Sequence, residues 1–263
     1  MKGTTNGLAW EDRGPERLSP ILLIRPLGGS MALWGEFADA LAREHRVIAF
    51  DALGTGESRG PPRASTRDLA SDARTVLDAR GVGRAHVFGI SLGGMVATRF
   101  AIAMPERVLA LVLASTAARG LAFERAGARR GLGFARCMTH EPHQAERCIV
   151  LRVLSPEFRA EHPAEAERIA DQAARLPSPR GTILAHAIAA LRHDARSELA
   201  RIRGRTLVLA GDRDHFLGPD ACLGLAGAIA RAERSVVERA GHDLTLENPG
   251  DTATRVLDFV RAV

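Results

Sequence analysis

Residues 85–104, which read AHVFGISLGGMVATRFAIAM, contain a predicted strand, a tight turn and a predicted helix in direct succession. The apolar residues 85–88 suffice for one buried strand, and from Met95 onward apolar side chains recur at helical spacing. The turn, Gly89-Ile90-Ser91-Leu92-Gly93, has glycine two positions before and after the serine, where so sharp a bend leaves no room for a Cβ. In this context the G-x-S-x-G pattern predicts a nucleophile at Ser91, facing the N–H groups of a helix N-terminus.

A second segment, Gly56–Gly60, matches the same pattern around Ser58. No apolar run leads directly into it, and the Pro61-Pro62 pair that follows begins no helix. The pattern without a strand and a helix around it predicts only a loop.

Apolar runs and helical patterns alternate along most of the chain. Buried strands are predicted at residues 21–24, 46–50, 85–88, 108–114, 206–210 and 235–238, with a short edge strand at 8–12. Helical patterns lie at about residues 34–45, 66–80, 92–104, 221–231 and 252–263. Unbroken apolar strands that alternate with helices predict an α/β fold with a mostly parallel central sheet flanked by helices. In such a sheet the functional residues gather at the carboxyl ends of the strands, where Ser91 is expected.

Residues 117–199 interrupt this alternation. The segment contains no strand run, is rich in Ala, Arg, Glu and His, and is divided by prolines into about four predicted helices. We interpret it as an all-helical lid over the strand ends, inserted between a first part of the core domain (1–116) and a second part (200–263). The alternative is that these helices only enlarge the core.

A serine hydroxyl needs a base to take its proton, and the base needs a partner that orients it. The loop after the strand at 206–210 carries Asp212 and Asp214, and Gly241-His242 follows the last strand closely. We predict His242 as the base, because it follows glycine in a strand-end loop, whereas each of the other histidines is more typical of surface or core. We favour Asp214 as its partner, and Asp212 as a loop cap.

The formal net charge of +5 does not indicate nucleic-acid binding. Lys2 is the only lysine, so the positive charge is almost entirely arginine, spread along the chain without interleaved aromatic residues. At most, this charge favours an anionic substrate by electrostatic steering.

The start of the chain has no apolar stretch typical of a signal peptide, and the longest apolar runs are too short to span a bilayer. Cys137, Cys148 and Cys222 form no metal-binding spacing and no paired framework. We therefore expect a cytoplasmic location in a reducing setting, without membrane contact and without a bound metal.

Several motifs together resemble the α/β-hydrolase fold superfamily over nearly the whole chain. They are Leu27-Gly28-Gly29, Asp51-x-x-Gly54-x-Gly56-x-Ser58, Gly89-Ile90-Ser91-Leu92-Gly93-Gly94, Gly211-x-x-Asp214 and Gly241-His242. Within the superfamily the chain looks most similar to 3-oxoadipate enol-lactone hydrolases. That likeness rests on residues 89–96, on Ser115-Thr116-Ala117-Ala118, and on His242 followed by Glu247-Asn248-Pro249.

The resemblance implies an oxyanion hole made by the backbone N–H groups of Leu27 and Leu92. Most of the superfamily has His-Gly-x-Gly at the first of these loops, whereas this chain has Arg25-Pro26-Leu27-Gly28. We assign Arg25 and Gly28 to substrate binding, since a guanidinium can hold a carboxylate with two hydrogen bonds. The alternative for Arg25 is an ion pair with an acid beneath the site.

These observations predict a cofactor-free serine hydrolase that cleaves a small ester or lactone through Ser91, His242 and Asp214 and an acyl-enzyme, and carboxylate-bearing substrates are among the candidates. One alternative is an α/β hydrolase of a biosynthetic pathway, acting as a thioesterase, C–C hydrolase or cyclase in the same pocket. Another is a non-catalytic ligand-binding protein on the same scaffold. Fold-level likeness does not decide between these activities.

Overall fold

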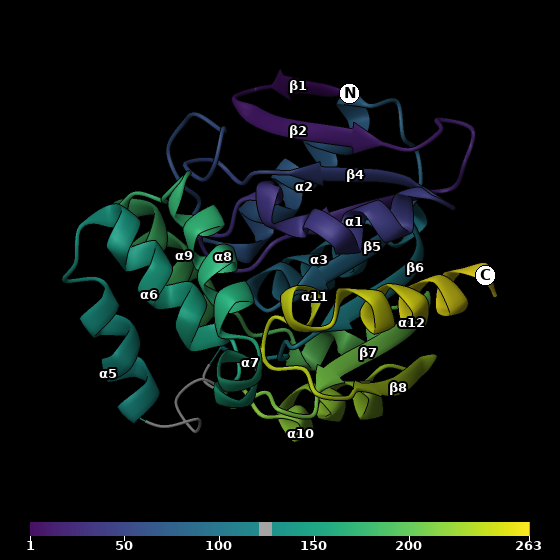
Figure 1. The fold of residues 1–263 in the computed structure, drawn as a ribbon. Coiled ribbons are helices and arrows are strands. Elements are labelled where there is room, and N and C mark those ends of the chain that lie inside the picture. The colour runs from purple at the N-terminus through teal and green to yellow at the C-terminus, as the bar shows by residue number, and fades with distance from the viewer. Residues whose placement is uncertain (121–127, 263) are drawn as a thin grey trace.

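The computed structural model describes residues 1–120 and 128–262, and its centre is a twisted sheet (Figure 1). Within these residues the sheet has eight strands in the order β1-β2-β4-β3-β5-β6-β7-β8. Their bounds are β1 Lys2–Thr5, β2 Leu8–Arg13, β3 Pro20–Ile24, β4 Arg46–Phe50, β5 Ala85–Ile90, β6 Val108–Ala114, β7 Arg205–Gly211 and β8 Ala232–Val237. The pairs β1–β2 and β2–β4 are antiparallel, and every pair from β4 to β8 is parallel. The predicted mostly parallel sheet is thereby confirmed.

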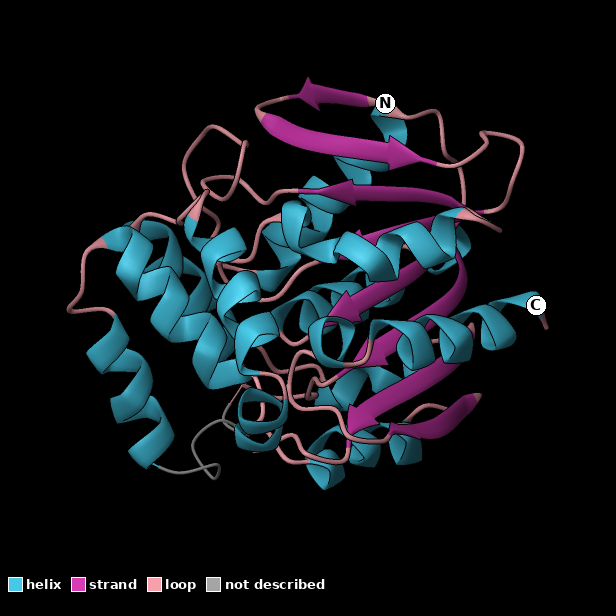
Figure 2. Cartoon of the chain, viewed as in Figure 1, coloured by secondary structure: helices cyan, strands magenta, loops and turns pink. Residues whose placement is uncertain are grey.

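Helices cover both faces of the sheet, because each central strand is apolar on both sides (Figure 2). On one face, α2 (Thr66–Ala79) packs beside α3 (Leu92–Ala103). On the other face, α1 (Gly35–Ala42) packs beside α12 (Pro249–Arg261), next to the short α11 (Leu244–Glu247). Two separate hydrophobic cores fill the spaces between these helices and the sheet. The result is a three-layer α/β arrangement.

The connection between β7 and β8 differs from the helix predicted at residues 221–231. The structure has the short α10 (Pro219–Leu223), followed by a 3-10 helix, η4 (Gly224–Ala228). Gly224 and Gly227 lie within the predicted helix, and glycine is a poor residue for a helix interior. β8 also begins three residues earlier than predicted and is a partly exposed edge strand.

Helices occupy the described part of the chain between β6 and β7, and we call residues 128–192 the helical segment. Its elements are α5 (Ala128–Cys137), α6 (Pro142–Val153), α7 (Pro156–Glu161), α8 (Pro163–Ala174) and α9 (Arg180–Arg192). Proline begins three of them, where a missing N–H is tolerated. The arrowheads of the parallel strands point toward this segment (Figure 1), so it lies beyond the carboxyl ends of the strands.

The helical segment rests on the sheet domain through a small core of its own. Val150, Leu154, Phe158 and Ile169 bury their side chains together with Leu33 of the 3-10 helix η1 (Met31–Trp34), which precedes α1. Burial of four or five side chains of this size stabilises the contact by several kcal/mol, at about 1.5–3 kcal/mol for each.

The expectation that the cysteines form no pair is wrong. Cys137 at the end of α5 and Cys148 in α6 form a disulfide, with their Cα atoms 5.5 Å apart, while Cys222 is a buried free thiol. The turn between two antiparallel helices brings the two residues together, and a spacing of eleven residues does not reveal such proximity in advance. The reducing, cytoplasmic setting inferred from unpaired cysteines therefore loses that support.

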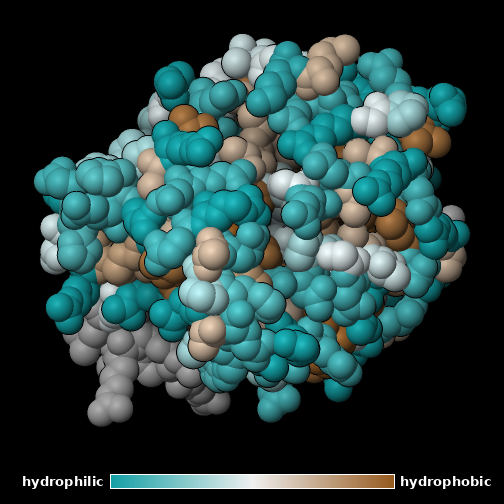
Figure 3. Space-filling view, in the orientation of Figure 1, coloured by the Kyte–Doolittle hydropathy of each residue, from teal (hydrophilic) through white to brown (hydrophobic). Residues whose placement is uncertain are grey.

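Hydrophilic side chains cover most of the face seen in Figure 3, and apolar residues there are scattered. Among the described helices, none combines the length and the hydropathy that a bilayer crossing requires.

Candidate active site

Ser91 lies on the turn between β5 and α3, with φ of 56° and ψ of −120°. A positive φ at a non-glycine residue is strained and often marks a functional position. The two flanking glycines permit the turn. A Cβ on Gly93 would lie 2.1 Å from the carbonyl oxygen of Ile24, and one on Gly89 would lie 2.2 Å from that of Gly93. The predicted requirement for glycine thus has a direct steric cause.

Ser91, His242 and Asp214 form one hydrogen-bonded series. The Ser91 hydroxyl donates to His242 Nε2 at 2.9 Å, and His242 Nδ1–H donates to Asp214 Oδ2 at 2.9 Å. This direction follows because a carboxylate only accepts, which places the ring proton on Nδ1. Asp214 follows β7 and His242 follows β8, and all three side chains are buried. The structure thus brings together the three residues that the sequence singled out, in the arrangement that activates a serine.

Burial and charge oppose each other in this series. Burial raises the pKa of Asp214, but the charge of His242 and hydrogen bonds from His242, Leu217 and Phe216 outweigh it and lower the pKa below its usual value. Burial lowers the pKa of His242, but the charge and hydrogen bond of Asp214 outweigh it and raise the pKa. An ionised Asp214 beside a histidine of increased basicity suits general-base chemistry.

The two aspartates of the β7 loop have different surroundings. Besides His242, Asp214 binds the loop itself, since its Oδ1 accepts the N–H groups of Phe216 at 2.8 Å and Leu217 at 2.9 Å. Asp212 is exposed, and its Oδ1 accepts the N–H of Ala240 at 3.2 Å. Asp212 therefore caps the neighbouring loop, and Asp214 is the residue in contact with His242.

Leu27 and Leu92, the two expected oxyanion donors, belong to two different segments. Leu92 is the first residue of α3, and Leu27 lies in the loop after β3. In the described parts of the chain, neither backbone N–H has a hydrogen-bond acceptor. Both N–H groups therefore remain available for a ligand oxygen, as an oxyanion hole requires.

Arg25 adopts the second of its two predicted roles, an ion pair with an acid. Its Nη2 donates to Asp243 Oδ2 at 2.9 Å, its Nη1 lies 3.5 Å from Thr245 Oγ1, and its guanidinium carbon lies 4.6 Å from the centre of the Trp34 ring. The pair is buried, with 5% and 3% of the two side chains exposed. A guanidinium engaged in this way holds the C-terminal loop in place, and we do not carry Arg25 forward as a substrate ligand.

Gly28 is the other residue assigned to substrate binding. Both its N–H and its carbonyl are hydrogen-bonded to side chains of the segment between β6 and β7. Its N–H donates to Nδ1 of His186 at 3.2 Å, and its carbonyl accepts the hydroxyl of Ser178 at 2.7 Å. Its peptide groups are therefore bound to protein rather than open to a substrate.

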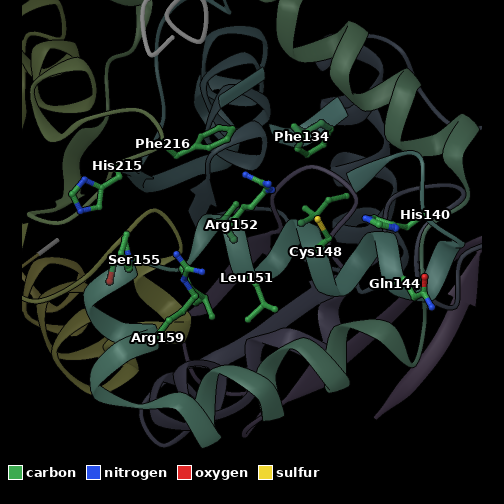
Figure 4. A pocket seen from close by; sticks show the side chains of 14 residues that line it. Phe134, His140, Gln144, Cys148, Leu151, Arg152, Ser155, Arg159, His215 and Phe216 are labelled. Atoms are coloured by element: carbon green, nitrogen blue, oxygen red, sulfur yellow. The ribbon is translucent and has the colours of Figure 1, made fainter. Parts of the chain in front are cut away.

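A cavity of about 620 Å³ opens between α5, α6 and the loop after β7. Figure 4 shows Arg152 and Arg159 among its lining side chains, together with Phe134, Leu151 and Phe216. The Phe216 ring also lies 4.7 Å from the His242 ring, centre to centre, so this aromatic side chain stands between the cavity and the serine site. The cavity combines apolar side chains with the exposed guanidinium groups of Arg152 and Arg159.

Asp51 and Ser58, which belong to the matching motifs, serve the loops around the site. Asp51 accepts the N–H of Met31 at 2.6 Å and that of Glu57 at 2.8 Å, which ties the loops after β3 and β4 together. The Ser58 hydroxyl donates to the carbonyl of Asp51 at 2.7 Å and accepts the N–H of Ala9 at 2.8 Å. The prediction that Ser58 is a loop residue is therefore confirmed.

Sequence reasoning missed several residues that support the site. The Thr116 hydroxyl donates to the carbonyl of Ser91 at 2.7 Å, and Asp243 pairs with Arg25. Asp243 directly follows His242, so its position gave a usable signal. Ser178 and His186 gave none, because they are 150 and 158 residues from Gly28 in sequence. In the parts that the structure describes, no group of three or more His, Cys, Asp or Glu could hold a metal ion.

A mostly parallel sheet with a serine on a strained strand–helix turn, followed in sequence by aspartate and histidine at later strand ends, defines the class of α/β hydrolases. Comparison with known families agrees, since residues 19–249 match the family described as alpha/beta hydrolase fold. The chain belongs to this family and is a hydrolase.

Individual relatives match nearly the whole chain. The protein named "Putative carbamate hydrolase RutD" from Azorhizobium caulinodans is 33% identical over 92% of this chain and 91% of its own length. The 3-oxoadipate enol-lactonase 1 of Acinetobacter baylyi is 27% identical over 79% of this chain and 76% of its own. Among solved structures, a hydrolase from Pseudomonas aeruginosa is 29% identical, with a TM-score of 0.84 over 99% of this chain and 97% of its own. The predicted superfamily is confirmed.

Proposed function

We propose that the chain is a serine hydrolase of small esters or lactones. The single observation that carries the proposal is the hydrogen-bonded series from Ser91 through His242 to Asp214, with both distances at 2.9 Å. A serine without a base, or a base without an orienting acid, would not support this chemistry.

In the proposed reaction, Ser91 Oγ attacks the carbonyl carbon while His242 Nε2 takes its proton. The N–H groups of Leu27 and Leu92 stabilise the negative oxygen that forms, a contribution of about 10²–10³ in rate for each donor. His242 then gives its proton to the leaving alkoxide, which leaves an acyl-enzyme on Ser91. Water, deprotonated by His242, hydrolyses this ester and restores the enzyme.

We propose that residues 117–199 form a lid. Helices α5 and α6 supply walls of the cavity that Phe216 also lines, and the Phe216 ring contacts His242, which supports a role of this segment in shaping the substrate site. The exposed guanidinium groups of Arg152 and Arg159 line this cavity, and their positive charge favours a substrate whose carboxylate extends to them. This residue pair takes over the role first considered for Arg25.

Carbamate hydrolysis is the second candidate, favoured by the relative at 33% identity whose name carries that activity. A carbamate carbonyl would use the same nucleophile and the same oxyanion donors. It differs in releasing an amine or ammonia rather than an alcohol.

The proposal is tested by steady-state hydrolysis assays with the wild type and with Ser91→Ala. The substrates are p-nitrophenyl acetate, an aliphatic γ-lactone and an N-alkyl carbamate. We expect turnover of the ester or lactone that falls by at least about 10³-fold in Ser91→Ala. Turnover of the carbamate alone would favour the second candidate. Turnover that survives Ser91→Ala would refute both.

A further inference from the structure

We infer that His186, on α9 of the helical segment, is a positioning residue for the oxyanion loop, which we define as residues 25–29. Its imidazole binds the peptide group that joins Leu27 to Gly28 and so anchors, one peptide further along, the loop that carries the Leu27 N–H. The inference rests on the proposed function, because it assigns to Leu27 the role of oxyanion donor.

The oxyanion loop is a tight turn that can exist in two forms. Gly29 N–H donates to the carbonyl of Pro26 at 3.1 Å, which closes a four-residue turn, and Gly28 has φ of +70°. That value at the third position is typical of a type II turn, whereas a type I turn differs by a flip of the central peptide. The central peptide here joins Leu27 to Gly28, so a flip would reverse the Leu27 carbonyl and the Gly28 N–H directly beside the peptide that carries the Leu27 N–H.

His186 binds that central peptide directly. The Gly28 N–H donates to His186 Nδ1 at 3.2 Å, and the Ser178 hydroxyl donates to the Gly28 carbonyl at 2.7 Å. Both side chains are buried, at 2% and 4% exposure. A flipped peptide would point a carbonyl oxygen at Nδ1 and would lose the hydrogen bond, so this contact favours the observed turn.

The imidazole is suited to accept in this place. Burial lowers the pKa of His186 to about 4, so the ring is neutral at pH 7, and the hydrogen bond at Nδ1 puts its proton on Nε2. Nε2 has no hydrogen-bond partner among the described residues, and His186 lines a cavity of about 20 Å³ together with Pro26 and Leu92. The ring therefore stands next to both proposed oxyanion segments and contacts the loop through Nδ1 alone.

The contact joins the proposed lid to the proposed catalytic machinery. On the same helix, the Thr182 hydroxyl donates to the carbonyl of Gly54 at 3.1 Å, which holds the loop after β4 as well. Helix α9 therefore acts as a brace on two loops at the carboxyl edge of the sheet.

Substitutions at His186 separate its two nitrogens. In His186→Asn the side-chain oxygen lies near the Nδ1 position and can still accept from Gly28. His186→Gln places an amide near the Nε2 position, and His186→Phe has no acceptor. We expect the second-order rate of Ser91 labelling by an alkyl fluorophosphonate, and kcat on any substrate turned over, to fall about ten- to a hundredfold in the Gln and Phe variants, with KM nearly unchanged. His186→Asn should keep rates within about threefold of the wild type.

His193 provides a matched control, because it is a buried histidine just after α9 whose ring contacts the Thr66 hydroxyl at 3.1 Å, outside the oxyanion loop. His193→Gln should lower the thermal midpoint without changing the labelling rate. Ser178→Ala, which removes the other contact to Gly28, should slow labelling in the same direction as His186→Phe. Protection of the Gly28 amide from hydrogen exchange, measured by NMR, should be lost in the Gln and Phe variants and kept in the Asn variant.

Wild-type labelling rates in folded His186→Gln and His186→Phe, or an unprotected Gly28 amide in the wild type, would overturn the inference alone. A wild type whose Ser91 is not labelled would contradict the proposed function. In that case the Gly28 amide would still report whether His186 holds the loop.

Discussion

At the scale of single residues, the site depends on which polar groups are bound and which are left open. Asp214 has both carboxylate oxygens occupied, by the loop N–H groups and by His242. Asp243 is occupied by Arg25, and Asp51 by two backbone N–H groups. The Leu27 and Leu92 N–H groups stand apart because the described protein offers them no acceptor. Two backbone N–H groups that remain open suit the binding of a negatively charged oxygen.

Asp214→Asn should reduce kcat by about 10³–10⁴-fold with little loss of stability. The amide oxygen can still accept the N–H groups of Phe216 and Leu217, but the amide group toward His242 no longer fixes the Nδ1–H tautomer. Asp212→Asn is the matched control, two residues away on the same loop, and should leave kcat within about threefold of the wild type. Equal losses in the two variants would show that the loop, not the carboxylate, matters.

At the scale of elements, local sequence predicted the sheet and the nucleophile turn well. The strand, the G-x-S-x-G turn and the helix at residues 85–104 are specified by neighbours within four residues of each other. Such a local pattern can be recognised in the sequence alone. The pairing of Asp214 with His242 was also predictable, because parallel strands place their carboxyl ends at one edge.

Contacts of the helical segment were not predictable in this way. His186 reaches Gly28 across 158 residues, and no local pattern distinguishes it from the other histidines. The short α10 replaced a predicted longer helix because tertiary packing and glycines outweighed a weak helical pattern. The sequence could not distinguish substrate binding from an ion pair for Arg25, because the acid that pairs with it lies near the opposite end of the chain.

The disulfide between α5 and α6 gives a direct prediction about thiols. Unfolded, non-reduced protein purified without reductant should expose one thiol per chain to a thiol-reactive dye, that of Cys222, and three after reduction. Reduction should destabilise the α5–α6 pair by about 2–3 kcal/mol, given the short loop that the bond closes. Cys222→Ser should expose no thiol before reduction. Three thiols in the non-reduced wild type would contradict the pairing.

At the scale of the whole molecule, stability depends on several ionisable groups that burial holds in neutral form. Burial raises the pKa of Glu146 on α6 to about 7 and lowers the pKa of His86 and His193 to about 4. The two kinds of group act in opposite directions on the pH dependence of folding. A raised carboxyl pKa stabilises the folded state at low pH, and that contribution is lost as pH rises through the folded value. A lowered histidine pKa stabilises the folded state at higher pH, and that contribution is lost as pH falls below about 6.5.

Glu146→Gln isolates one of these contributions. Between about pH 4.5 and 7 the folded wild type holds a proton on Glu146 that the unfolded chain releases, so wild-type stability should fall relative to the variant as pH rises. Urea unfolding gives the difference in free energy of unfolding between the wild type and the variant. This difference should change by about 3 kcal/mol between pH 4.5 and pH 8. The exposed Glu44, whose pKa is lowered by its hydrogen bond with Arg261, is the control. Glu44→Gln should give a difference that is constant from pH 5 to 8, and the same constancy for Glu146→Gln would refute the prediction.

The central claim is that Ser91 is an activated nucleophile, and covalent labelling tests it most directly. The protein is incubated with an alkyl fluorophosphonate at pH 7.5, and the adduct is mapped by peptide mass spectrometry. The chain contains an internal control, because Ser58 lies in the same G-x-S-x-G pattern but its hydroxyl is bound to the backbone of Asp51 and of Ala9 in β2. The account predicts one adduct per chain, on the peptide that holds Ser91, and none on that of Ser58. No adduct on Ser91 in folded protein, or equal labelling of both serines, would contradict it.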